Sequence, residues 1–136
     1  WEAVYENSRF DFLVKKDEDS SESESCYIEV KGVTLEVDGR AMFPDAPTER
    51  GVKHVLELIK AKEQGYRAAV IFLIQIENVK AFSSNSTMDE EFSMALYKAY
   101  RNGVEVYAFN CKVTEEEVAL KEKVQVLLWL DGLRFL

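Results

Sequence analysis

The sequence predicts an α/β domain, more closely an α+β arrangement in which helices flank a mixed central sheet. Segments with strand periodicity and two segments with helical periodicity follow one another along the chain, which is the pattern of a sheet covered by helices. The 136 residues, 47% apolar and 12% aromatic, suit one globular domain with its own core. We therefore expect residues 1–136 to form a single domain.

The first strands are expected near the start of the chain. Residues 9–14 and 27–35 alternate in polarity and are rich in aromatic and β-branched side chains, as strands are. The acidic and serine-rich residues 17–25 contain no apolar anchor, which predicts a solvated hairpin loop. An Asp-Gly turn signal at 38–39 predicts that residues 40–43 return as a third strand beside the second.

Two helices are expected further along. From Thr48, which would act as the N-cap, apolar residues recur at the spacing of one helix face, and Gly65 would close this helix. Residues 89–102 show the same period and end just before Gly103.

The remaining strands lie between and after the helices. Residues 67–76 are almost continuously apolar, which predicts a central strand buried on both faces. Residues 105–113 alternate in polarity and predict another strand, and residues 124–130 are expected to form a last one.

Composition narrows the classes of function. No apolar run reaches about 18 residues, so we expect a soluble, cytoplasmic protein with no membrane partner. Cys26 and Cys111 are too few for a disulfide framework and are expected to be buried free thiols, and a lone histidine, His54, excludes a multi-histidine zinc site. The net charge of −8 disfavours nucleic acid, but residues 17–24 contain five acids, and the remainder carries only −3.

A carboxylate and an amine stand two residues apart in the second predicted strand. Glu29 and Lys31 should point to the same face, and Asp11 can approach that face if the first strand pairs alongside. Two such oxygen ligands suit Mg²⁺ or Mn²⁺, which activate water for phosphodiester hydrolysis, while the lysine would position that water. From spacing alone, charges on the exposed face of a half-buried sheet explain this pattern more often than a metal site does.

Three separate segments resemble the sugar fermentation stimulation protein A family. They are NSRFDFL at 7–13, a run from 28 to 54 that contains IEVKGVTL and FPDAPTERGVKH, and GVEVYA at 103–108. The resemblance extends from Asn7 to about Val126 and implies a PD-(D/E)XK restriction-endonuclease-like core in a DNA-binding protein. It also implies that the family's N-terminal OB-fold-like domain is absent from these residues.

The same resemblance implies roles for individual residues. Asp11 and Glu29 take the places of the two acidic metal ligands and, with Lys31, form the catalytic set. Asp11 follows Phe rather than Pro, so the PD motif is not literal; Pro-Asp at 44–45 does spell it, but after the Glu-x-Lys segment.

Several accessory residues keep alternative interpretations. Asp45 is expected either at the helix entry, which is favoured, or as an extra metal ligand. Gln75 ends the central strand and is either near the site or a strand-end amide that bonds a loop. Arg9 is one strand step from Asp11 and should share its face, where the guanidinium can pair with the carboxylate either to keep a metal ligand deprotonated or as a purely structural contact.

The start of the first helix is a candidate phosphate site. Arg50 is the best DNA-binding residue because its guanidinium can bind phosphate through two bonds. For Lys53 phosphate binding and simple solvation are equally favoured, and for His54 a solvated position is favoured.

Two functions remain open at this stage. One is a Mg²⁺- or Mn²⁺-dependent DNA endonuclease; the other is a non-catalytic DNA-binding regulatory factor of sugar metabolism that keeps the nuclease-like fold. No sugar ligand is expected, and a homo-oligomer stays open.

Overall fold

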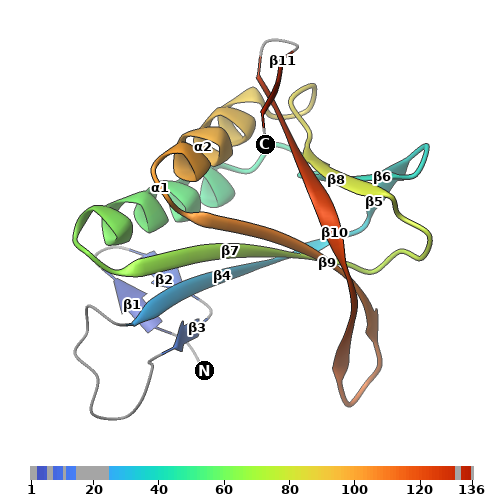
Figure 1. Ribbon diagram of the computed structural model, residues 1–136, viewed down its shortest axis with the longest axis horizontal. Helices are drawn as coiled ribbons and strands as arrows, with labels where there is room; N and C mark the ends of the chain where they lie inside the picture. The colour runs from blue at the N-terminus through green and yellow to red at the C-terminus, as the bar shows by residue number, and fades with distance from the viewer. Residues whose placement is uncertain (1–2, 6–7, 11, 15–24, 131–132, 136) are drawn as a thin grey trace.

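The fold is described from a computed structural model (Figure 1), which describes residues 3–5, 8–10, 12–14, 25–130 and 133–135. Within these residues, two helices pack against each other and cover one face of a strongly curled mixed sheet. The predicted fold class, a mixed α/β sheet with flanking helices, is confirmed.

The helices are α1 (Glu49–Glu63) and α2 (Glu90–Arg101). The strands of the described residues are β1 (Ala3–Tyr5), β2 (Ser8–Phe10), β3 (Phe12–Val14), β4 (Cys26–Val33), β5 (Leu35–Val37), β6 (Arg40–Phe43), β7 (Arg67–Ile74), β8 (Ala81–Ser84), β9 (Glu105–Val113), β10 (Val118–Leu130) and β11 (Leu133–Phe135).

The main sheet has the strand order β3-β4-β7-β9-β10-β8-β6-β5, and β11 pairs with β10. Neighbours β4, β7 and β9 run parallel, as do β6, β8 and β10, whereas β3–β4, β5–β6 and β9–β10 are antiparallel. Because β5 follows β4 after a single residue, Thr34, yet lies at the far end of the strand order, the sheet curls back on itself.

The starts of the two helices are tied together. Thr48 caps α1 by accepting a hydrogen bond from the Gly51 amide at 2.9 Å. Asp89 caps α2 through Oδ1, which accepts from the Phe92 amide at 3.0 Å, while its Oδ2 accepts from the Thr48 amide at 2.8 Å. A single carboxylate therefore satisfies amide donors at both helix starts, where no backbone partner is available.

Aromatic side chains fill the space between helices and sheet. Phe72 of β7 is fully buried and stacks on Phe82 of β8 with ring centroids 4.3 Å apart. Phe92 of α2 packs edge-on against Phe72 and against Phe43 of β6. The core thus joins both halves of the curled sheet to α2.

Three predictions about single elements need correction. The central strand β7 is not buried on both faces: Ile71 and Leu73 are only half-buried, because both helices cover the opposite face. Strand β8 was not predicted, and β10 begins at Val118, earlier than expected. Residues 17–24 of the expected loop lie outside the described residues, whereas Ser25 is buried. The described part of the chain contains no helix with both the length and the apolar character needed to cross a membrane.

Candidate functional site

The conspicuous polar cluster of the interior joins β4 to α1. Oε1 of Glu29 lies 2.9 Å from Nζ of Lys31 and 2.9 Å from Nδ1 of His54, and Nζ and Nδ1 are 3.0 Å apart. Glu29 is only 3% exposed and His54 only 7%. The prediction that Glu29 and Lys31 share a face is confirmed, and the expectation of a solvated His54 is wrong.

The surroundings of His54 favour the neutral form of its imidazole. Burial lowers the pKa of His54, the nearby Glu29 carboxylate opposes this effect, and the charges of Lys31 and Arg50 lower the pKa further. Because Nδ1 of a neutral ring carries either a proton or a lone pair, it either donates to Glu29 or accepts from Lys31. His54 therefore acts as a hydrogen-bonding support between the carboxylate and the ammonium.

The second oxygen of Glu29 is available for a ligand. Oε2 is buried and has no hydrogen-bond partner among the described residues, and a buried carboxylate oxygen without a partner is costly unless something binds it. An oxygen of this kind suits a hard cation such as Mg²⁺ or Mn²⁺. No group of three or more His, Cys, Asp or Glu side chains that could hold a metal occurs among the described residues, so Glu29 could supply only one ligand of such a site.

The structure does not describe every residue that was predicted to form the catalytic set and its surroundings. Asp11 lies outside the described residues. Its neighbour Phe12 in β3 pairs with Ile28, the residue before Glu29. Arg9 lies in β2, but its side chain is not described.

The basic residues of α1 lie beside the cluster. Arg50 is exposed in the first turn, one helical turn before His54, and its charge acts on that imidazole. Lys53 is exposed on the next turn. Arg50 is thus a cation of α1 whose charge acts on the cluster, at an end of the helix where backbone amides also favour anions.

Two accessory residues are not brought to the cluster. Asp45 is exposed in a bend before α1, and the contacts at the helix entry are made by Thr48 and Asp89 instead. Gln75 lies beside Gly32, where a Cβ would be 3.7 Å from its Nε2. Because alternate residues of a strand face opposite ways, the Gln75 amide lies on the face of β4 opposite to the side chain of Lys31.

Sequence reasoning missed a second buried carboxylate. Glu57 lies one turn after His54 on the buried side of α1 and is 7% exposed, and none of the described residues forms a hydrogen bond with its Oε2. Lys60 is 3.9 Å from its other oxygen. The available signal was the i, i+3 spacing of His54 and Glu57, which puts both on one helix face.

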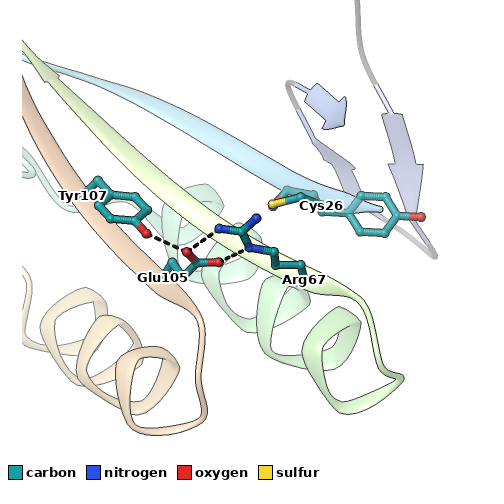
Figure 2. A network of polar contacts seen from close by, with 5 residues as sticks. Cys26, Arg67, Glu105 and Tyr107 are labelled. Carbon is teal, nitrogen blue, oxygen red and sulfur yellow. Dashed lines mark hydrogen bonds and ion pairs between the residues drawn. The ribbon is translucent and has the colours of Figure 1, made fainter. Parts of the chain in front are cut away.

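A second polar network, on the opposite face of the sheet, is structural (Figure 2). Arg67 donates two hydrogen bonds to Glu105, at 2.6 and 2.8 Å, and the Tyr107 hydroxyl donates to the same carboxylate at 2.6 Å. These bonds lower the pKa of Glu105. Burial raises the pKa of the neighbouring Cys26 thiol, so this cysteine is not an activated nucleophile. Cys26 and Cys111 are buried and free, as predicted.

Comparisons with known proteins agree on one family. Residues 1–117 match the family model described as the sugar fermentation stimulation protein RE domain. Sugar fermentation stimulation protein homologs from Caldanaerobacter subterraneus and Clostridium tetani are 54% and 51% identical over 127 residues, which is 93% of this chain. The chain spans 53% and 54% of these relatives.

A solved structure has the same fold. The Pyrococcus furiosus protein of the same name, SfsA, described in complex with Ca²⁺, has a TM-score of 0.76 and 29% sequence identity. The match covers 88% of this chain and 50% of that chain.

Proposed function

This chain belongs to the sugar fermentation stimulation protein family, and on that premise we propose that it binds DNA and hydrolyses phosphodiester bonds with Mg²⁺ or Mn²⁺. Asp11 and Glu29 are the proposed metal ligands, Lys31 the proposed catalytic cation, and Arg50 and Lys53 the proposed phosphate contacts.

One observation carries the proposal: the buried Glu29 carboxylate has one oxygen held and the other free. Lys31 and His54 fix Oε1, while Oε2 has no hydrogen-bond partner within the described part of the chain. Hydrogen bonds from neighbouring residues to one carboxylate oxygen orient a metal ligand before the metal binds. The Ca²⁺ in the Pyrococcus furiosus relative supports a site for a hard, oxygen-binding cation.

Arg50 and Lys31 would have different roles in the reaction. Arg50, near the start of α1, would bind a DNA phosphate, which places the scissile group over the Glu29 side of β4. Lys31 would orient the attacking water and offset the negative charge that develops on the phosphorus oxygens. A divalent metal would lower the pKa of that water and polarise the phosphate.

A non-catalytic DNA-binding function has one observation in its favour. Nζ of Lys31 lies 2.9 Å from Oε1 of Glu29 and 3.0 Å from Nδ1 of His54, so part of the three-donor capacity of the ammonium is already used within the cluster and not for a water molecule. The two functions differ in what the carboxylate does. For a catalyst it is required, whereas for a binder it only repels an anionic ligand.

Incubation with single-stranded and double-stranded DNA in Mg²⁺, Mn²⁺ or EDTA tests the proposal. Asp11→Asn, Glu29→Gln and Lys31→Met are compared with Glu77→Gln, which changes an exposed carboxylate far along the chain from the cluster. We expect slow, metal-dependent cleavage without sequence preference, lost in the first three variants and kept in Glu77→Gln.

Two outcomes would contradict the nuclease proposal. Clear DNA binding with no cleavage under any metal condition, together with tighter binding by Glu29→Gln, would establish the regulatory alternative. Cleavage that persists in all three site variants would place the activity elsewhere.

A further inference from the structure

The side of the helix pair that faces away from the cluster carries an apolar groove. It lies between α1 and α2, has a cavity volume of about 610 Å³, and includes Leu56 of α1 and Met94 and Ala95 of α2. Leu56 is 40% exposed and Met94 is 49% exposed. Leu56 is two residues from His54, about 200° around the helix, so the groove and the Glu29 cluster occupy opposite sides of α1.

Charges of opposite sign stand at the two ends of this groove. Glu91 lines it near the start of α2, and Lys98 and Arg101 line it near the end. Glu91 and Lys98 are seven residues apart, so they lie on one face of the helix, about 10 Å from each other. Met94 and Ala95 lie midway between them. Along α2 the lining of the groove therefore changes from acidic, through apolar, to basic.

Such a surface is complementary to itself under a twofold rotation. An axis that passes between Met94 and Ala95, perpendicular to α2, would turn a second α2 antiparallel to the first. Glu91 would then face Lys98 of the partner subunit, with Arg101 of the partner subunit one turn further, while the apolar centres would pack together. Closed twofold contacts of this kind use the same patch on both subunits.

We propose that this groove is the interface of a symmetric homodimer, in which a second copy of the chain lays its α1–α2 face on the first. The two Glu29 clusters then point away from the interface. The charge order selects a second copy over a DNA segment, because an apolar floor with Glu91 at one end offers no continuous basic surface for phosphates. The proposal does not depend on the nuclease function.

Charge reversal tests the pairing directly. Sedimentation velocity of the full chain over a concentration series would be compared for wild type, Glu91→Lys, Lys98→Glu and the double variant. We expect a concentration-dependent dimer for wild type. Each single reversal should raise the dimer Kd at least about tenfold, since like charges then face each other twice per dimer. The double variant should return to within about threefold of wild type.

Glu90→Lys is the matched control, because Glu90 lies in the same first turn of α2 but does not line the groove. It weakens the favourable interaction with the helix dipole as Glu91→Lys does and should leave the dimer Kd unchanged. Thermal unfolding of each variant confirms folding independently of association. A monomer at all concentrations up to about 0.5 mM, a dimer insensitive to both single reversals, or a double variant as weak as the singles would overturn the proposal.

Discussion

Oε1 of Glu29 in β4 lies 2.9 Å from Nδ1 of His54 in α1, so a buried contact links the proposed metal ligand to the helix that carries Arg50. The position of the carboxylate and the position of the phosphate-binding helix are thereby coupled. Changes at either residue should affect both metal binding and DNA binding.

Removal of the charge on Glu29 should weaken metal binding without changing the shape of the side chain. Glu29→Gln keeps a hydrogen-bond acceptor for Lys31 but replaces the anionic oxygen with a weaker ligand set. We expect the Mn²⁺ affinity of Glu29→Gln, measured by calorimetry, to be lower than that of wild type by at least about tenfold. The affinity of His54→Gln should fall by about 10–100-fold, as is typical when a residue that hydrogen-bonds a metal ligand is replaced. Unchanged Mn²⁺ affinity in Glu29→Gln would remove this carboxylate from the metal site.

Arg50 should contribute a purely electrostatic contact to DNA. Loss of one phosphate contact reduces the slope of log K against log salt concentration by roughly one and weakens binding equally for all sequences. We therefore expect Arg50→Ala to show both effects in fluorescence anisotropy measured from about 50 to 200 mM salt. Glu49→Ala, at the neighbouring exposed position, serves as the control, and an equal slope for wild type and Arg50→Ala would exclude the contact.

The elements that the sequence predicted well carry their own start and stop signals. Thr48 and Gly65 flank α1, and the alternation of residues 105–113 matches the bounds of β9. Strand β8 has no such signal, since the short Ala81–Ser84 segment ends in two serines. Its pairing with β6 and β10 exists only in the folded sheet, where tertiary context overrides local propensity.

The site was predictable only in part for a similar reason. Strand alternation is enough to put Glu29 and Lys31 on one face. Which polar residue of α1 meets them depends on how the helix is rotated against β4, and that rotation is set by packing of the core. His54 lies at the edge of the apolar stripe, so its sequence position alone does not show that it is buried.

Folding stability should fall as the pH decreases through the region around 6.5 because of His54. Burial lowers the pKa of this imidazole below its ordinary value of 6.5, so in this range the unfolded chain binds a proton that the folded chain does not. Unfolding is therefore favoured as pH decreases, with a slope of at most about 1.4 kcal/mol per pH unit. His54 is the single histidine of the chain, and free carboxylates titrate mostly below this range.

Urea unfolding of wild type and His54→Gln at several pH values measures this effect. The variant should show a flatter dependence of the unfolding free energy between pH 7 and 5.5, while both proteins lose stability at lower pH as carboxylates protonate. Parallel curves for the two proteins over the whole range would show that His54 does not lose its proton affinity on folding.

Substitution of Gly51 by alanine should destabilise the protein, although alanine is the better helix former by about 1 kcal/mol. A Cβ at this position would lie 2.8 Å from Cγ2 and 3.0 Å from Oγ1 of Thr48, and 3.3 Å from Cδ1 of Phe92. Thr48 would have to rotate, and its cap bond to the residue 51 amide would be lost at a cost of about 1 kcal/mol. Overpacking against the buried Phe92 ring adds about 1–3 kcal/mol.

The double variant Gly51→Ala with Thr48→Ser separates these two costs, because serine keeps the capping oxygen but lacks Cγ2. We expect Gly51→Ala alone to lower the free energy of unfolding by about 1–3 kcal/mol, and Thr48→Ser to recover part of the loss. Higher stability of Gly51→Ala than of wild type in urea unfolding would mean that the helix start has room for a methyl group. The close packing of α1 on α2, which fixes Arg50 beside the Glu29 cluster, would then be looser than these distances indicate.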